Sequence, residues 1–486
     1  MDKVKRYALY LLVIAGCGGL LFDFGGTIIG PALPYIGPTD ENPGSLGLFT
    51  TTQVAHLSSA VVMCAALACL AAGWLTEKFG RKMMMLVSAA VAALACVPIC
   101  MTNGNYPMFF LGRAMQGVAA GFIGVVVPMY LAECLDANSR GKGAGMFQLL
   151  DFIGITFCSI VGLVVVHTIG AADDATVTVA RKSLAWKTIF WSSAAPAVLF
   201  FLGALGLKES PRWLYRRGRK EEALAALAAN NGAEKAKEIL AEMIAADEAA
   251  AAEKAKNAAA TDTLFQKKYV IPFILAVVIL ACNQTTGINS VLNYTVTIFQ
   301  KTGMQGAFAN VSDVAIKIMN CVMTIVACAL VDKKGRKFLL KLGTSGIIVG
   351  LCGVGAIFLA ISKAWVAPSM VTGVLATVFF FMFIGFYAVG PGVCVWLALT
   401  ELMPTRIRAN GMAIAMIINQ GVSAGIATVF PKWCAATNDN GTVFFVLAGF
   451  TVVYFITAAF FLPETKGRTL EEVEKYFTTG KMPEKK

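Results

Sequence analysis

Long apolar runs dominate this sequence, and short polar or charged loops separate them. A bilayer core about 30 Å thick is crossed by about 20 helical residues, so an apolar run of this length predicts a membrane-spanning helix. We find twelve such runs, near 7–36, 54–75, 83–101, 107–131, 143–167, 185–207, 269–299, 313–331, 338–362, 366–398, 409–430 and 441–462. The predicted fold class is therefore all-α and polytopic, with twelve transmembrane helices.

The composition agrees with a membrane protein and argues against soluble domains. Hydrophobic residues make up 57% of the chain and charged residues only 14%, whereas soluble domains have about 25% charged residues. The net charge of +12 would suit a nucleic-acid partner, but the basic residues gather in alternate loops, as the positive-inside rule describes. We therefore expect no nucleic-acid partner, and we expect both termini on the cytoplasmic side of a cell membrane, either plasma or inner.

Charged motifs repeat six predicted helices apart. Glu77-Lys-Phe-Gly-Arg-Lys82 follows the second helix, and Asp332-Lys-Lys-Gly-Arg-Lys337 follows the eighth. Glu133 precedes Arg140 by seven residues, and Glu401 precedes Arg408 by the same number. Two parallel repeats of six helices are a known transporter architecture, with the substrate site near the midplane between them. We predict six-helix bundles at 1–207 and 269–463, a charged helical linker at 208–268 and a cytoplasmic tail at 464–486.

Together with these repeats, three further motifs carry a resemblance that spans nearly the whole chain. They are Glu209-Ser-Pro-Arg-Trp-Leu214, Gln284-Thr-Thr-Gly-Ile-Asn289 and Pro463-Glu-Thr-Lys-Gly467. In this order they resemble the sugar porter family of the major facilitator superfamily, whose members are facilitative or proton-coupled. The resemblance implies two six-helix bundles, transport by alternating access, and a monosaccharide substrate, with a hexose such as glucose favoured.

Charged residues at the predicted cytoplasmic helix ends suggest a gate. Arginine and carboxylate side chains pair in bidentate geometry when partly desolvated, and such pairs would break when the two halves rock apart. The candidates are Glu77, Arg81, Glu133, Arg140, Asp332, Arg336, Glu401 and Arg408. By resemblance Glu209, Arg212 and Glu464 join this network, while Asn293 and Tyr294 stand at an outer gate. The alternative is that these pairs only fasten loops.

A sugar presents many hydroxyl groups and one apolar face, so neutral amides and an aromatic ring suit its binding site. At mid-helix depth the candidates are Gln148, Asn283, Gln284, Asn289, Trp396, Asn419 and Gln420. The resemblance implies that Gln148, Gln284, Asn289 and Trp396 contact the sugar. Asn283 departs from a usual glutamine, Gln420 from a tryptophan and Ser423 from an asparagine, which leaves the particular sugar open. A local break of the helix at Gly287 is also expected.

Ionisable residues inside a bilayer are costly and usually functional, and Asp23, Arg113 and Asp151 are candidates for proton coupling. Proton-coupled relatives resemble this chain in having an acid on the first helix, but Asp23 lies two residues early, about 200° around a helix. Asp151 lies one turn after Gln148 and is a second candidate carrier, or else pairs with Arg113 or Lys317 for assembly. Lys317 lies toward the outer side, where it could snorkel.

Several alternatives remain open from the sequence. The chain could be a passive sugar facilitator, a transporter of another polyol or organic solute on the same fold, or a non-transporting nutrient sensor, although the tail after Pro463 is short for signalling. We see no nucleophile–base pair, metal-ligand spacing or phosphate loop, so an enzyme is not expected. We expect no cofactor and no bound metal, a lipid bilayer and a monosaccharide as partners, a proton if transport is coupled, and function as a monomer.

Overall fold

The computed structural model describes residues 3–39, 44–135, 137–241, 243–245, 267–304, 306–403, 408–436, 440–464 and 476–477. Within these ranges the regular structure is helical, and twelve helical segments are long and apolar enough to cross a membrane. The predicted all-α fold with twelve spans is confirmed. The bounds are α1 Lys3–Phe22, α2 Phe24–Thr27, α3 Ile29–Ile36, α4 Thr51–Phe79, α5 Arg81–Leu94, α6 Cys96–Cys100, α7 Tyr106–Cys134, α8 Ala137–Thr168, α9 Val179–Trp191, α10 Ala194–Leu205, α11 Pro211–Arg216, α12 Lys220–Asn231, α14 Lys267–Thr285, α15 Ile288–Lys301, α16 Ala307–Lys334, α17 Arg336–Ser362, α18 Met370–Val389, α19 Pro391–Leu402, α20 Arg408–Ala436, α21 Asn440–Ile456 and the π-helical turn Thr457–Phe461.

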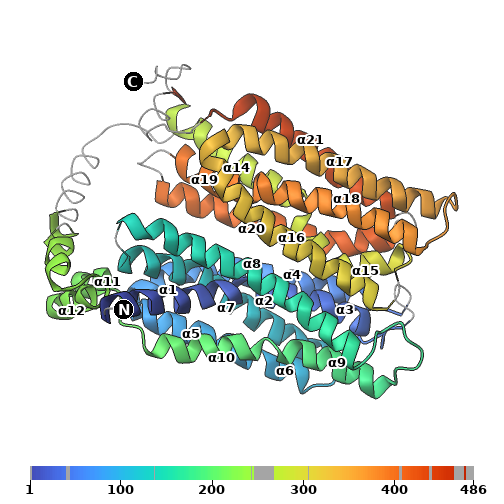
Figure 1. Ribbon diagram of the computed structural model, residues 1–486, viewed down its shortest axis with the longest axis horizontal. Helices are drawn as coiled ribbons and strands as arrows, with labels where there is room; N and C mark the ends of the chain where they lie inside the picture. The colour runs from blue at the N-terminus through green and yellow to red at the C-terminus, as the bar shows by residue number, and fades with distance from the viewer. Residues whose placement is uncertain are drawn as a thin grey trace.

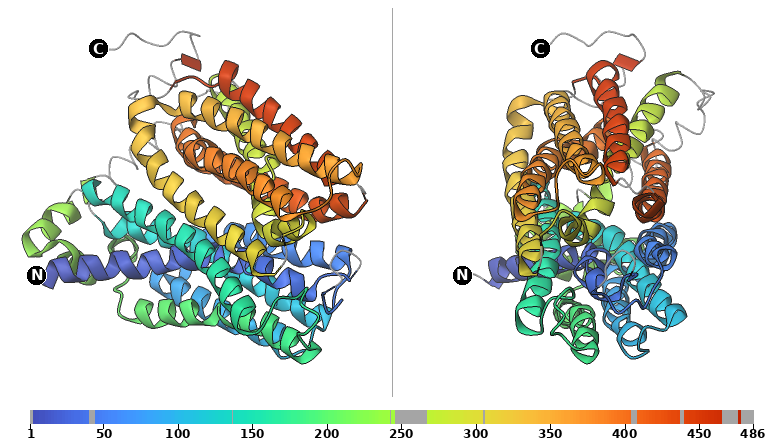
Figure 2. Two further views of the ribbon diagram at one scale, coloured as in Figure 1. Left: turned by 45° about the vertical axis from the view of Figure 1, so that its right-hand side comes forward. Right: turned by 90° about the vertical axis from the view of Figure 1, so that its right-hand side faces the viewer.

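The helices form two bundles, one from α1–α10 and one from α14–α21, which lie side by side (Figure 1). We call them the N-half and the C-half. Helix α1 begins at the end of the molecule where α11 and α12 lie, which we call the terminal end; the opposite end is the far end (Figure 1). The ribbons of the two halves meet at the far end and diverge toward the terminal end (Figure 2). Across the interface α3 packs against α15, α4 against α20 and α8 against α16.

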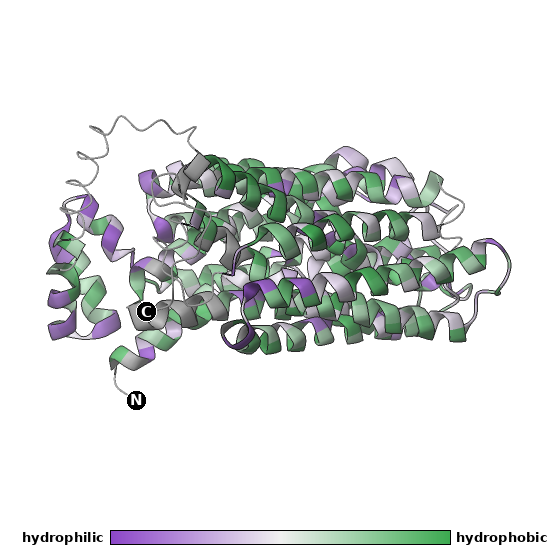
Figure 3. Ribbon diagram, turned by 90° about the horizontal axis from the view of Figure 1, so that it is seen from above, coloured by the Kyte–Doolittle hydropathy of each residue, from purple (hydrophilic) through white to green (hydrophobic). Residues whose placement is uncertain are grey.

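Apolar residues make up most of the two bundles, and hydrophilic residues gather toward the terminal end, on α11 and α12 above all (Figure 3). Large apolar residues such as Leu67, Leu199 and Val371 are exposed on the outer helix faces. A helix that is apolar on all sides is typical of a chain surrounded by lipid. The exposed apolar surface is therefore the face expected to contact the bilayer.

Several spans are interrupted, and the interruptions lie where the sequence disfavours a continuous helix. The first span breaks at Asp23 and again at Ile28, next to Gly25-Gly26. The seventh breaks between α14 and α15, where Gly287 has a φ of +77°, a left-handed conformation that glycine adopts without steric cost. The tenth breaks at Gly390, directly before Pro391. The predicted break at Gly287 is confirmed.

Candidate substrate-binding site between the halves

The break at Gly287 brings three amide side chains of the seventh span together. Asn283 and Gln284 lie in the last turn of α14, and Asn289 lies in the first turn of α15. Asn289 donates hydrogen bonds from Nδ2 to Gln284 Oε1, at 3.0 Å, and to Ser423 Oγ on α20, at 3.2 Å. An uninterrupted helix would set Gln284 and Asn289 five residues and about 140° apart. The break therefore allows both amides to serve one site.

Asn289 is exposed, although it lies well inside the membrane span Tyr269–Lys301 and its neighbours Ile288 and Ser290 are buried. A polar side chain at this depth is costly against lipid and is normally directed to the bundle interior or a water-filled space. Because α15 packs on α2 and α3 of the N-half, we interpret the open side of Asn289 as facing the space between the halves.

Asn283 and a further predicted amide of the C-half, Asn419, keep unused hydrogen-bonding atoms. Asn283 donates to the Tyr387 hydroxyl at 3.2 Å, and its Oδ1 has no partner among the described residues. Asn419 on α20 is 1% exposed, and its Oδ1 also lacks a described partner. Gln420, next to it, is half-buried. A buried polar atom without a partner costs free energy, so these oxygens are ready acceptors for hydroxyl groups.

On the N-half side, α8 carries Gln148 and Asp151. Gln148 Nε2 donates to Asp151 Oδ2 at 3.3 Å, while Oδ1 of Asp151 is buried without a described partner. Asp23, at the break between α1 and α2, lies close enough to Asp151 for the two carboxyl groups to interact electrostatically. The structure thus joins the two acids that the sequence suggested separately. It gives Asp151 no hydrogen bond to Arg113 or Lys317, the partners considered for a purely structural role.

Arg113 on α7 is fully buried and binds backbone oxygens. Its guanidinium donates to the carbonyls of Leu57 (3.1 Å), Gly25 and Gly26 (3.3 Å), and to Gln116 Oε1 at 2.8 Å. Two of these partners, the Gly25 and Gly26 carbonyls, lie at the break in the first span. The structure gives Arg113 no hydrogen bond to Asp23 among the described residues.

A row of buried polar residues on α16 was not predicted from the sequence. Five residues of α16 are no more than 6% exposed and recur at helical spacing on one face: Asn310, Asp313, Lys317, Asn320 and Thr324. The spacing of three and four residues is visible in the sequence, but the sequence-based prediction treated Lys317 alone and did not include the other four residues. The expectation that Lys317 snorkels is wrong. Its ammonium lies 3.0 Å from the Asp313 carboxylate and 2.7 Å from Ser159 Oγ on α8 of the other half.

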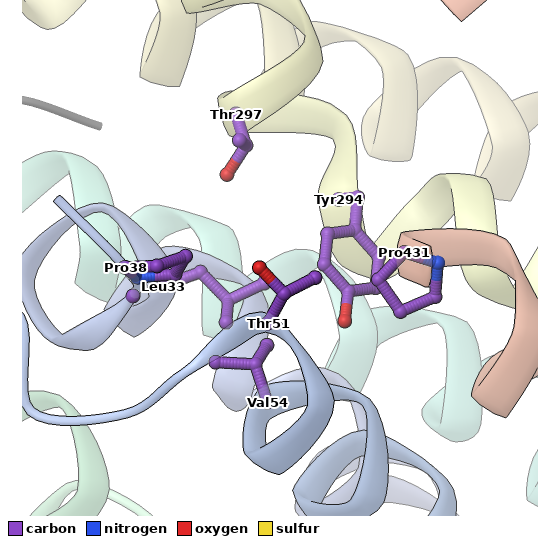
Figure 4. A pocket seen from close by; sticks show the side chains of 8 residues that line it. Leu33, Pro38, Thr51, Val54, Tyr294, Thr297 and Pro431 are labelled. Atoms are coloured by element: carbon purple, nitrogen blue, oxygen red, sulfur yellow. The ribbon is translucent and has the colours of Figure 1, made fainter. Parts of the chain in front are cut away.

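At the far end the two halves are in close contact around the predicted outer gate. The Tyr294 hydroxyl lies 3.1 Å from Ser58 Oγ of α4, and the Asn293 carbonyl lies against Gly30 of α3. A cavity of about 20 Å³ lies there, with Leu33, Thr51 and Val54 of the N-half facing Tyr294, Thr297 and Pro431 of the C-half (Figure 4). That volume holds about one water molecule, which is far less than a sugar needs.

At the terminal end, the predicted network of the N-half is formed within that half. Arg81 is 1% exposed and binds Glu133 through Nε and one Nη, both at 2.8 Å, and Glu77 at 2.7 Å. The Glu133 carboxylate also accepts from Ser210. These bonds join α4, α5, α7 and the segment before α11. Each ion pair described at this end stays on one side of the interface, which matches the divergence of the halves there.

Glu209 and Glu464 bind in the same way in the two halves. Glu209 accepts from the backbone amides of Arg81 and Lys82, at the start of α5, and Glu464 accepts from those of Arg336 and Lys337, at the start of α17. Carboxylates are favourable at helix N-termini because the amides there lack intrahelical partners. Gly80 and Gly335 precede these amides at φ values of +95° and +90°. The two arrangements lie 255 residues apart.

For the remaining predicted gate and site residues, the structure describes few side-chain contacts or none. Arg336 donates from its side chain to the Val331 carbonyl at 3.3 Å, as Arg81 does to that of Thr76 at 3.2 Å. Arg212 is half-buried on α11, without a hydrogen bond or ion pair among the described residues. Some predicted side chains fall outside the described part, although their backbones are helical: Arg140, Asp332, Trp396, Glu401 and Arg408.

The sequence profile described as sugar (and other) transporter matches residues 11–477. The major myo-inositol transporter IolT of Bacillus subtilis (strain 168) is 28% identical over 96% of this chain and 93% of its own length. The facilitated glucose transporter protein 1 of Caenorhabditis elegans is 29% identical over 85% of this chain and 78% of its own.

Solved structures share the fold. The inward-open xylose transporter XylE of E. coli superposes with a TM-score of 0.78 at 22% identity, over 96% of this chain and 99% of that one. The proton:xylose symporter XylE bound to 6-bromo-6-deoxy-D-glucose gives 0.74 at 23% identity, over 98% and 100% of the two chains. With its twelve spans in two halves and a profile match over nearly its whole length, this chain belongs to the sugar porter family of the major facilitator superfamily, and is a sugar or polyol transporter rather than an enzyme.

Proposed function

We propose that the protein carries a monosaccharide, with a hexose such as glucose favoured, across a cell membrane by alternating access. The observation that carries this proposal is the group of amides at the break of the seventh span, Gln284 and Asn289 bonded to each other and Asn283 beside them. Neutral amides can replace the water around a sugar's hydroxyl groups without the cost of desolvating a charge. Gln148 would complete the site from the N-half.

The described conformation suits one stage of this cycle. The far end is closed around Tyr294 and Ser58, while the halves diverge toward the terminal end (Figure 2). With the termini in the cytoplasm, which the basic loops favour, this is an inward-facing state with a closed outer gate. The charged residues of the terminal end would then form the cytoplasmic gate when the halves rock together.

The substrate proposal is tested by counterflow in proteoliposomes with labelled hexoses, pentoses, polyols and myo-inositol. We expect saturable exchange of a hexose, and loss of exchange in Gln284→Ala and Asn289→Ala with normal expression. Asn231→Ala is a matched control, because this amide lies on α12 and donates to the Leu227 carbonyl of its own helix. Undiminished exchange in both variants would remove the site assignment. Preference for a polyol, which the named relatives of this chain make the strongest alternative, would change the substrate class.

We further propose that transport is coupled to a proton held by Asp151 and Asp23. Two ionised carboxylates side by side repel one another, and one shared proton removes that repulsion. Asp151 also bonds Gln148, so its protonation state can affect the substrate position. A relative of the same fold, XylE, is named a proton:xylose symporter, which supports coupling as an available mechanism.

Coupling is tested by uptake driven by an imposed proton gradient, acidic on the outer side. We expect wild-type protein to accumulate sugar above equilibrium, and Asp151→Asn to lose accumulation while retaining counterflow. Asp174→Asn serves as the control, since Asp174 is exposed in a far-end loop. Wild-type uptake that ignores the gradient would identify a passive facilitator instead.

A further inference from the structure

The Asp313–Lys317 pair on α16 has no role in the sugar site or in the proposed proton carrier. Both side chains are nearly inaccessible, 1% and 2% exposed, and the ammonium also donates to Ser159 of the opposite half. Like the contact between Tyr294 and Ser58, this hydrogen bond joins the two halves. It therefore connects a buried charge pair to the surface along which the halves must separate.

The position of the pair along the membrane normal is fixed by helix geometry. Lys317 lies ten residues, about 15 Å, from the start of α16, and Ser159 lies nine residues, about 13 Å, from the end of α8. Those two helix ends meet at the far end, where the Gly306 amide donates to Asp173 Oδ2 at 3.0 Å. The charge pair thus lies in the far half of the interface, close below the closed gate.

The energetic consequence follows from desolvation. When the far end is closed, Asp313 and Lys317 are removed from water, which costs several times the free energy of an ordinary polar contact. When the far end opens, water can reach α16 and restore that hydration. The pair itself stays intact in both states because both residues belong to one helix, so the difference between the states is hydration and the bond to Ser159.

We infer that Asp313 and Lys317 are positioning residues for transport: their burial opposes closure of the far end, the Ser159 hydroxyl offsets part of that penalty, and together they keep the two conformations close in free energy. The inference rests on the proposed alternating access but not on the identity of the sugar. Without such an element, the closely packed far end would hold the protein in one state.

Two variants should shift the equilibrium in opposite directions. Ser159→Ala removes one hydrogen bond to a charged group in the closed state only, so the open far-end state gains about tenfold in population. Asp313→Leu combined with Lys317→Met replaces the ions with apolar groups of similar size, which favours the dry, closed state by about tenfold or more. If the ion pair were merely structural, both variants would be less stable, and they would not shift the conformational equilibrium in opposite directions.

The measurement is hydrogen–deuterium exchange of the backbone amides in α3 and α15, on the full chain in lipid nanodiscs without substrate. We expect faster exchange in Ser159→Ala, slower exchange in the double variant, and wild-type exchange in Ser159→Thr, which keeps the hydroxyl. Ser88→Ala is the control, because this buried hydroxyl bonds the Met84 carbonyl within α5. Thermal unfolding verifies that each variant is folded.

Shifts in the same direction for Ser159→Ala and the double variant, or no shift relative to Ser88→Ala, would overturn the inference. Because no sugar is present, this failure is distinct from failure of the proposed function, which counterflow reports. If both variants are folded and show the expected exchange, the ratio of the KM values measured from the two sides of the membrane should change in one direction in Ser159→Ala and in the other direction in the double variant.

Discussion

Gly30 offers the sharpest test of the closed far end. A Cβ atom at this position would lie 2.7 Å from the Asn293 carbonyl oxygen of the opposite half, and that oxygen is backbone rather than a mobile side chain. Ordinary contact begins near 3.4 Å, so Gly30→Ala requires α3 and α15 to separate by about 0.7 Å. Forced displacement in a packed interior costs about 1–3 kcal/mol, which corresponds to about a 5- to 150-fold shift toward the state with an open far end.

Gly26→Ala is the matched control, because it lies one turn earlier and its Cβ would meet only Val61 at 3.9 Å, within its own half. Both substitutions add one methyl group to the first span, but only the one at Gly30 meets the opposite half, so their difference reports the contact between the halves. We expect Gly30→Ala, but not Gly26→Ala, to raise hydrogen exchange in α15 and to lower counterflow. Equal exchange in the two variants would refute the reasoning that backbone contact at Gly30 closes this end.

Three further predictions concern the ion pairs and gates. Glu133→Gln should lower the free energy of unfolding by about 3–5 kcal/mol, because it breaks a buried ion pair with Arg81. Glu77 also pairs with Arg81, but its side chain is 50% exposed, so Glu77→Gln should lower the free energy of unfolding by no more than about 1 kcal/mol. Similar melting temperatures of the two variants in detergent would contradict this prediction. Tyr294→Phe removes the bond to Ser58 and should weaken far-end closure by about 1 kcal/mol, measured as faster exchange of α15 amides. Gly335→Ala would place a Cβ 2.6 Å from the Glu464 carboxylate and would strain a backbone with positive φ. It should therefore lower the melting temperature by several degrees. Gly421→Ala is the control, because the Cβ added there meets nothing within 4 Å.

The sequence predicted the parts of this fold that depend on one helix at a time. Apolar length located the twelve spans, and Gly287 indicated the break that unites the amides of the seventh span. The motif repeat indicated the two halves. These features are local, because each is set by hydropathy or by the conformation of a single residue.

Contacts between helices were harder to infer. The position of Lys317 along its helix could be counted from the sequence. That its ammonium contacts Asp313 and Ser159 could not be inferred, because packing sets the rotation of α16 against α8. The same holds for the meeting of Asp23 with Asp151, which depends on a break in the first span. Asp313 and Asn320 belong to a polar row that is recognisable only when all polar residues of one helix face are considered together.

The matching carboxylate caps at Glu209 and Glu464 imply a history for the chain. Two units that keep the same backbone turn and the same cap 255 residues apart are most simply explained by duplication of one ancestral gene segment. In the proposed function the first copy supplies the acids Asp23 and Asp151 together with Gln148, and the second copy supplies the carboxamides of the seventh span. A substitution at Asp151 or Gln148 would therefore alter the proposed proton carrier and the proposed solute site together, whereas the amides of the second copy can vary without a change to the acids.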